Sequence, residues 1–201
     1  MAKFILGQKM EMSQVFDKNG KSLPVTLVKA MPNVVVQVKT VEKDGYVATQ
    51  IGAGEKKAKN IKKPQRGHFK DLGNFRFLRE SRLPLDLKAG DKIEVSVFEE
   101  GDIVSVRGIS KGKGFQGVVK RHGFHGGSRT HGQKHSEREP GSIGQTNMQR
   151  VMKGMRMAGR MGGEKVTVKN LKIAKIDKDQ NIIAILGAVP GARGTLIEIK
   201  G

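Results

Sequence analysis

Short apolar segments separated by turn residues recur along much of the chain. Residues 93–97 alternate apolar and polar side chains, the period of two that indicates a half-buried strand. Further β-type segments, bounded by Asp, Asn, Gly and Pro, are expected at residues 23–29, 34–41, 46–51, 103–109, 166–176, 181–186 and 195–199. Strands at this spacing predict a closed or nearly closed antiparallel β-barrel, because closure hides strand edges that would otherwise aggregate.

Two segments interrupt this pattern and are expected to be inserts. The first, residues 54–90, opens with a cluster of bases and later carries enough apolar side chains for a small core: Phe69, Phe75, Phe77 and Leu78. The second, residues 119–162, is rich in glycine, lysine and arginine. The chain is therefore predicted to be mainly β, with a barrel built from residues 1–53, 91–118 and 163–201.

The basic segment and the residues that flank it are unusual in composition. Between Arg107 and Gly163 the chain carries twelve Lys and Arg residues and fourteen glycines against two acids, Glu137 and Glu139. Like charges repel and glycine loses much backbone entropy on ordering, so this segment should not fold alone and should be mobile without a partner. A flexible basic loop held at both ends by an ordered body is suited to be ordered by a polyanion.

The charge of the whole chain supports this interpretation. The 201 residues include 38 Lys and Arg against 19 Asp and Glu, a formal net charge of +19, which makes nucleic acid the leading partner. A membrane is the competing partner, but no apolar run approaches the roughly 18 residues of a spanning helix. The N-terminal apolar run is too short for a signal peptide, so a cytoplasmic protein is expected. The absence of cysteine excludes disulfides and thiolate chemistry.

A glycine motif offers a rival interpretation as a nucleotide site. Gly112, Gly114 and Gly117 form a GxGxxG after a probable strand, which formally resembles a dinucleotide fingerprint. That fingerprint needs a following helix, whereas the residues after Gly117 are poor helix formers. Glu137 has the spacing of the required acid but lies within the basic segment. We expect these glycines to allow close approach to phosphate, and we expect no cofactor and no small-molecule substrate.

Histidines gather in the same segment. Their spacing could bring together zinc ligands, but the neighbouring Lys and Arg side chains would repel a cation and no carboxylate stands among the histidines. We therefore expect no metal site. We expect the imidazoles to stack on nucleobases or to donate to phosphate and 2′-hydroxyl groups. No serine–histidine–acid set or carboxylate pair is evident, so no catalytic residue is expected.

Two further observations concern recognition. Met148, Met152 and Met155 have helical spacing with bases roughly opposite, which predicts a short amphipathic turn whose methionines pack inward. Aromatic residues make up 4% of the chain, with one Tyr and no Trp. Since single-strand readers depend on aromatic stacking, this scarcity favours recognition of the shape and backbone of structured RNA.

Motifs spread over almost the whole chain carry a family resemblance. The strongest is Gly-Ile-Ser-Lys-Gly-Lys-Gly-Phe-Gln-Gly at residues 108–117. Others lie at residues 7–16, 24–26, 63–64, 67–69, 120–121, 130–132, 140–144 and 157–162. In this order they resemble the bacterial family of large-subunit ribosomal protein three. The resemblance implies a barrel like those of translation factors, a small α/β insert at 54–90 and a long extended loop that penetrates ribosomal RNA.

The same resemblance implies a function. Family members are non-enzymatic constituents of the large ribosomal subunit in the cytoplasm, with large-subunit rRNA and neighbouring ribosomal proteins as partners. They bind that rRNA near its 3′ end, act early in assembly and extend the loop toward the peptidyl transferase centre, an approach that matches residues 142–151 here. Many relatives carry a methylatable glutamine in an Asn-Gln-Thr-Pro-Gly stretch. Here the stretch departs from that pattern, with Asn147 at the matching position and Gln145 or Gln149 nearby.

The expected RNA-binding residues are the bases of the first insert, with a solvated face as the alternative, and the polar residues of the basic segment. They are Lys56, Lys57, Lys62, Lys63, Arg66, Lys111, Lys113, Lys120, Arg121, His122, His125, Arg129, His131, Lys134, His135, Arg138, Gln145, Asn147, Arg150, Lys153, Arg156 and Arg160. Two rival classes remain at this point, an architectural DNA-binding protein and an RNA-modifying or nucleotide-using enzyme.

Overall fold

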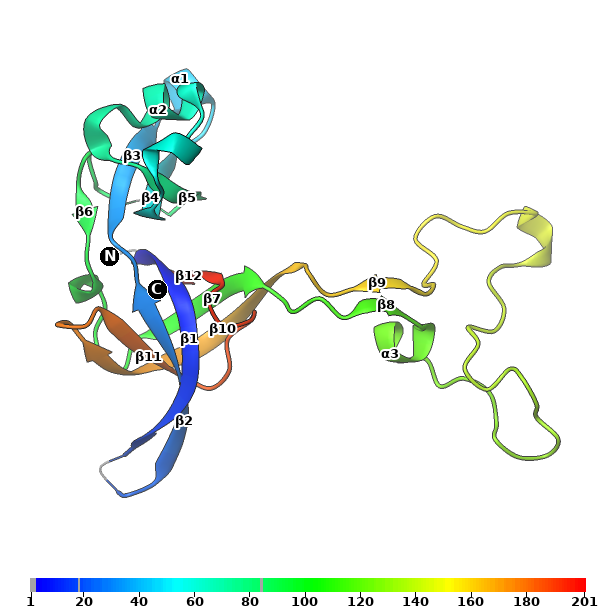
Figure 1. Cartoon of the computed structure of the whole chain (residues 1–201). Coiled ribbons are helices and arrows are strands. Elements are labelled where there is room, and N and C mark those ends of the chain that lie inside the picture. Colours follow the sequence, from blue (N-terminus) through cyan, green and yellow to red (C-terminus); the bar gives the residue numbers. More distant parts are fainter. Residues whose placement is uncertain (1–2, 18, 84) are drawn as a thin grey trace. The chain divides into compact units, whose positions relative to one another are not determined.

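The computed structural model describes residues 3–17, 19–83 and 85–201 (Figure 1). Contacts between residues divide the chain into two compact units. One comprises residues 1–109 and 165–201 and is called the body. The other, Ser110–Glu164, is called the arm.

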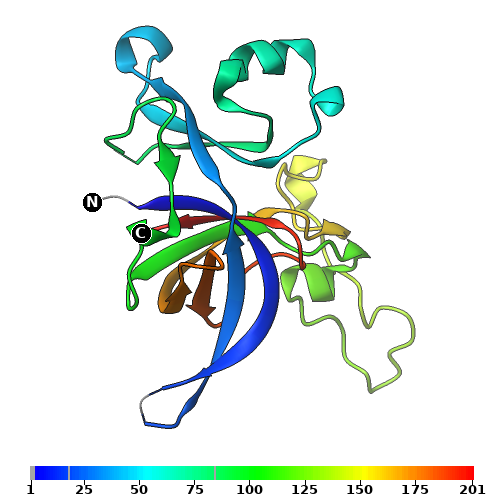
Figure 2. The ribbon, with the colours of Figure 1, turned by 60° about the vertical axis from the view of Figure 1, so that its left-hand side comes forward.

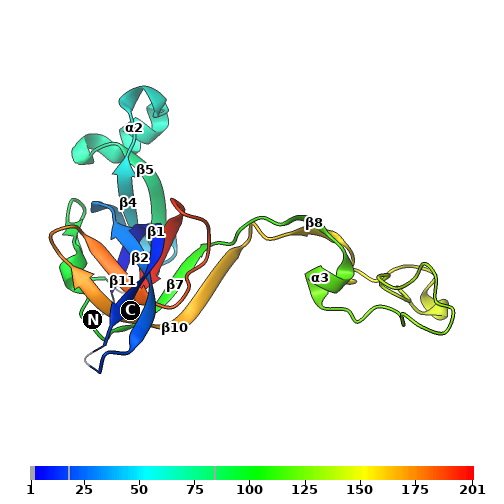
Figure 3. The ribbon, with the colours of Figure 1, turned by 60° about the horizontal axis from the view of Figure 1, so that its bottom comes forward.

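Within the described part of the body, six antiparallel strands close into a barrel (Figures 1 and 3). In order around the barrel these are β1 (Phe4–Phe16), β12 (Leu196–Lys200), β7 (Ile103–Ile109), β10 (Lys165–Asp177), β11 (Ile182–Leu186) and β2 (Ser22–Ala30). Every strand contributes apolar side chains to the interior, mostly β-branched residues such as Ile5, Val28, Val106 and Ile183. The mainly β fold with a closed antiparallel barrel is therefore confirmed.

A second sheet accompanies the barrel in the body (Figure 2). Its strands, in spatial order, are β5 (Phe75–Ser81), β4 (Ala48–Glu55), β3 (Asn33–Lys39) and β6 (Lys92–Ile93). The helical segments near it are α1 (Val41–Asp44), η1 (Ala58–Asn60), α2 (Lys63–Phe69) and η2 (Lys70–Leu72). A core shared with the outer side of β1 includes Leu6, Val35 and Ile51, and a smaller one beside α2 includes Phe69.

The strand predictions near residue 54 were wrong about which sheet the strands join. The segments at 34–41 and 46–51 had been assigned to the barrel, but β3 and β4 pair with each other in the second sheet. Residues 92–93, also assigned to the barrel, pair with β3. An alternating pattern shows that a strand has a buried face, but it does not identify the neighbouring strand. Of the four residues predicted to form a small core, Phe69, Phe75 and Leu78 pack together.

The predicted strand at 93–97 is also wrong in its length. Only Lys92–Ile93 is a strand, and Val95–Val97 is the short 3₁₀ segment η3. Ile93 packs into the core beneath the second sheet, whereas Val95 packs into the barrel interior. The alternation therefore reflects a chain that passes between two cores, not one face of one sheet.

Asn33 links the two sheets of the body. This buried side chain accepts a hydrogen bond from the Leu6 N–H at 3.0 Å and donates to the Leu6 carbonyl oxygen at 3.0 Å. It also donates to the Met31 carbonyl oxygen at 2.6 Å. The amide satisfies backbone groups of β1 that would otherwise be buried without partners, which is costly.

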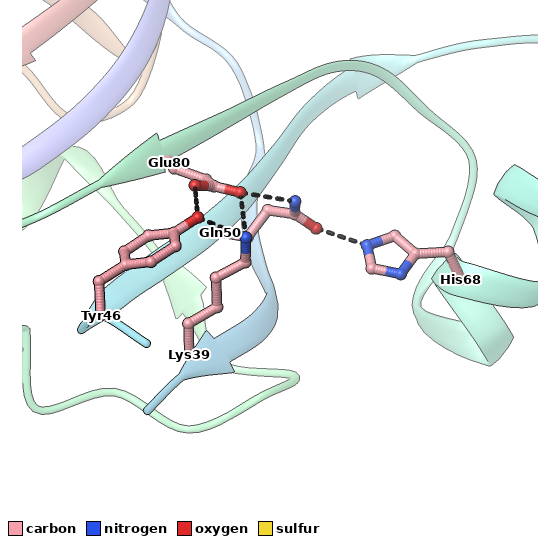
Figure 4. Close-up of polar contacts among 5 residues, drawn as sticks. All are labelled: Lys39, Tyr46, Gln50, His68 and Glu80. Carbon is pink, nitrogen blue, oxygen red and sulfur yellow. Dashed lines mark hydrogen bonds and ion pairs between the residues drawn. The ribbon is translucent and has the colours of Figure 1, made fainter. Parts of the chain in front are cut away.

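A polar network crosses the second sheet and reaches α2 (Figure 4). Lys39 pairs with Glu80 at 2.8 Å and donates to the Tyr46 hydroxyl at 2.7 Å, and that hydroxyl donates to Glu80 at 2.9 Å. Gln50 donates to Glu80 at 3.3 Å, and its carbonyl oxygen lies 2.5 Å from His68 Nε2 on α2. The hydrogen bond from Lys39 is the main reason why the pKa of the Glu80 carboxyl lies below its ordinary value.

The network predicts a pH-dependent effect of Glu80→Gln. Because the folded pKa of Glu80 is depressed, its stabilising effect is present above the unfolded pKa of about 4.5 and is lost as the pH falls through the folded value. Glu80→Gln should therefore lower the urea midpoint slightly at pH 7, and the difference from wild type should shrink in acid. Glu42→Gln, an exposed change on α1, is the matched control and should have little effect. A Glu80→Gln midpoint equal to wild type at pH 7 would contradict the network's role.

Candidate nucleic-acid interface

The arm begins as a hairpin stem. Strand β8 (Gly114–Gln116) pairs with β9 (Gly159–Met161), with Phe115 opposite Arg160. Two further hydrogen bonds continue the stem toward its first and last residues. The Lys113 N–H donates to the Met161 carbonyl oxygen at 2.9 Å, and the Ser110 N–H donates to the Glu164 carbonyl oxygen at 2.9 Å. The stem is continuous in the chain with β7 and β10, where Ile109 lies opposite Lys165. Lys111 and Lys113 are therefore held on ordered backbone, with exposed side chains.

A short helix follows the stem, contrary to expectation. Helix α3 (Val118–His122) occupies the residues that were judged poor helix formers (Figure 3). Its Val118 is the single buried apolar side chain among the described arm residues, and Gly123 ends the helix in the left-handed conformation with its N–H bonded to the Val119 carbonyl oxygen. Burial and this cap, not propensity, stabilise the helix. With five residues it does not provide the long helix of a dinucleotide site, and Glu137 is paired with Arg129.

Two of the predicted RNA-binding residues hold the arm together. Arg121 donates from Nη1 to the Met157 carbonyl oxygen at 2.8 Å, and His122 Nε2 lies 3.0 Å from the same oxygen. Both side chains also line a hollow of about 480 Å³ beside the stem, together with Lys111 and Lys113. This hollow gathers Lys111, Lys113, Arg121 and His122 with one acid, Glu164, so cationic donors outnumber the acid around it.

Beyond α3 the chain forms an irregular loop with one closed turn. The Gly127 N–H donates to the Glu137 carbonyl oxygen at 2.9 Å, and Arg129 forms an ion pair with the Glu137 carboxylate. Gly126 lies so close to this carbonyl that a Cβ there would overlap the oxygen. His125, His131, Lys134, His135 and Arg138 lie in or next to this turn and are exposed. In the described part of the chain, no three His, Asp or Glu side chains gather as metal ligands would.

The predicted amphipathic methionine turn is wrong. The residues form only the 3₁₀ turn η4 (Thr146–Met148) and a turn in which the Met155 N–H donates to the Met152 carbonyl oxygen. Met148 is 48% exposed and Met152 is 52% exposed, so neither packs inward. Among the described arm residues only the apolar side chain of Val118 is buried, so the methionines have no core to join, and an isolated helix of this length is unstable in water.

Most of the predicted arm residues present free charge or polar groups to solvent. Exposed side chains belong to Lys111, Lys113, Lys120, Arg129, Lys134, Arg138, Gln145, Asn147, Arg150, Lys153, Arg156 and Arg160. Across the described arm, Arg129 is the single base among them in an ion pair. The other predicted cluster lies in the body, with Lys56, Lys57 and Lys62 between β4 and α2, and Lys63 and Arg66 on α2 itself.

A basic group in the body was not singled out from the sequence. Arg76, Arg79, Arg107 and Lys165 line a groove of about 340 Å³. Arg107 had been counted only with the basic segment, and the others had not been considered. They come from three separate parts of the chain, so no local motif could have revealed them.

Comparison with known proteins then decides the family. The model of the ribosomal protein L3 family matches residues 88–186. The large ribosomal subunit protein uL3 of Listeria welshimeri is 49% identical, and those of Streptococcus pyogenes and Bacillus thuringiensis are 48% identical. Each match covers 100% of this chain and 97% of the relative. The chain belongs to the ribosomal protein L3 family. The resemblance carried by the motifs is thereby confirmed. Each of the three relatives is named as a protein of the large ribosomal subunit.

The described helices bear on the membrane alternative as well. None of them in residues 3–17, 19–83 and 85–201 is both long and apolar enough to cross a bilayer.

Proposed function

We propose that this L3-family chain is a non-catalytic structural constituent of the large ribosomal subunit, located in the cytoplasm as part of the ribosome. It binds large-subunit rRNA near its 3′ end, acts early in subunit assembly and contacts neighbouring ribosomal proteins. Its arm extends toward the peptidyl transferase centre, with residues 142–151 at the approach.

One observation carries this proposal: the described part of the arm presents many exposed Lys and Arg side chains and buries one apolar side chain, that of Val118. Such a segment gains little from its own packing and carries strong self-repulsion, both of which a polyanion would offset. Membership of a family of large-subunit ribosomal proteins favours rRNA as that polyanion. Because aromatic side chains are scarce, contact with phosphate and ribose is expected to dominate over base stacking.

Binding measurements as a function of salt test the proposal. The full chain should bind large-subunit rRNA with a log affinity that falls linearly with log salt, by about 0.7–0.9 for each phosphate neutralised. Duplex DNA in the same salt should bind more weakly. Equal affinity for the two would favour an architectural DNA-binding protein, and an absence of footprints near the rRNA 3′ end would contradict the proposed location.

A further inference from the structure

The groove noted above lies in the body, between strand β5 and the outer surface of the barrel. On β7 the side chains of Val104 and Val106 point into the barrel, so those of Arg107 and Ile109 point outward. The register places Lys165 of β10 opposite Ile109. Arg76 and Arg79 of β5 form the other wall. Four bases from three distant segments therefore surround one hollow of about 340 Å³.

The charges of this groove are unbalanced. The single acid that lines it is Glu198 of β12, and its carboxylate is already paired with Arg79 at 3.0 Å. Among the residues that the structure describes, Arg76, Arg107 and Lys165 form no ion pair. The register places Glu198 directly opposite Arg107, so the hollow holds four cations and one carboxylate, and an anion placed there would relieve the remaining repulsion between the cations.

The lining also limits what kind of anion fits. Phe77 is the aromatic residue of the groove, and the Arg76 guanidinium covers its ring at 5.1 Å from the centroid. The guanidinium therefore occupies one face of the ring, where a nucleobase would otherwise stack. Guanidinium groups bind phosphate through paired N–H donors, and Lys binds it as a point charge. The groove is thus suited to a phosphodiester backbone and poorly suited to reading bases.

We propose that this groove is a second RNA-binding site, which holds a backbone segment of rRNA through Arg76, Arg107 and Lys165, while Arg79 stays paired with Glu198. The proposal rests on the proposed function for the identity of the polyanion, but it concerns the body and not the arm. An acidic protein segment is the competing occupant. Continuous phosphate charge matches three unpaired cations better than a peptide whose carboxylates must first be positioned.

Removal of charge from the groove is the first test. In the full chain, Arg107→Gln with Lys165→Gln should lower the slope of log affinity for rRNA against log salt by about 1.4–1.8, the value for two phosphate contacts. The matched control is Lys172→Gln with Lys175→Gln, which removes the same charge from exposed positions of β10 outside the groove. The control should change the slope much less. Equal changes in the two variants, or no change in the first, would overturn the proposal.

The outcomes separate the groove from the proposed function. If wild-type chain prefers rRNA and the groove variant matches it, the groove is not a binding site and the proposed function stands. If wild-type chain shows no preference for rRNA, the proposed function itself fails, and the groove proposal fails with it.

Directed cleavage gives a second, local measurement. The chain has no cysteine, so Ile109→Cys would introduce a sole thiol at the groove for a tethered iron–EDTA group. Hydroxyl radicals from this position should cut an rRNA backbone segment in the bound complex. Lys178→Cys, in the exposed turn between β10 and β11, is the control and should give a different or weaker set of cuts. No cuts from position 109 in a complex that still binds rRNA would contradict the proposal. A crosslink from position 109 to an acidic protein in assembled subunits would support the competing occupant.

Discussion

Replacement of residues 121–154 by a short glycine–serine linker is expected to leave the body folded and to reduce rRNA affinity on the order of a hundredfold or more near 0.1 M salt. The three apolar cores consist of residues from the body alone, in the described part of the chain. The removed residues contribute no side chain to any of them. They do carry six bases, Arg121, Arg129, Lys134, Arg138, Arg150 and Lys153. If each contacts one phosphate, the salt slope should fall by about 4–5.

Tyrosine fluorescence would report on the body in this experiment. Tyr46 is the sole tyrosine, there is no tryptophan, and Tyr46 belongs to the polar network of the second sheet. The urea midpoint of unfolding, followed by Tyr46 fluorescence, should be the same in wild-type chain and in the linker variant. A full-length variant with the six bases changed to Gln is the matched control, since it separates the loss of charge from the loss of chain. An unfolded body in the linker variant would show that the division into body and arm is wrong.

Gly162→Ala is expected to disrupt the stem of the arm and to weaken rRNA binding about tenfold, the effect of roughly 1.4 kcal/mol. Gly162 has a φ of +75°, and a Cβ there would overlap the carbonyl oxygen of Lys111 and crowd Gly112. The stem must move to accommodate the methyl group, which displaces Lys111 and Lys113 from the hollow beside α3. Strain of this kind costs about 1–3 kcal/mol.

Gly163→Ala is a closely matched control. Gly163 has a φ of +71°, and a Cβ there would have no neighbour within 4 Å. The two variants therefore share the backbone strain and differ in the overlap. Hydrogen exchange at the Lys113 N–H, which bonds to Met161, should accelerate in Gly162→Ala much more than in Gly163→Ala. Equal exchange rates and equal rRNA affinities would show that the close approach to Lys111 does not matter.

The sequence predicted the barrel because its strands carry a local signal. Residues 103–109 alternate outward and inward side chains, and the structure places β7 over the same residues. The partner of each strand depends on contacts between distant segments, so β3 and β4 were assigned to the wrong sheet. Val95 shows the same limit, since its burial in the barrel interior could be anticipated but its departure from a strand could not.

The candidate site divides in a similar way. The exposed Lys and Arg side chains of the arm could be predicted because their segment is dominated by glycine and like charges, a property of composition. Helix α3 was missed because the burial of Val118 is a tertiary contact. The groove was missed because Arg76, Arg107 and Lys165 become neighbours only when the second sheet packs against the barrel.

The hydrogen bonds of Asn33 bear on how the chain would meet its RNA. They fix the second sheet to β1, so both walls of the groove take their positions when the body folds. A preorganised surface loses little conformational entropy on association, whereas the loop beyond α3, which is predicted to be mobile without a partner, would lose more. The bimolecular step therefore costs less conformational entropy if RNA first meets the body and the loop is ordered afterwards. Ordering of the loop would then be an effectively unimolecular step.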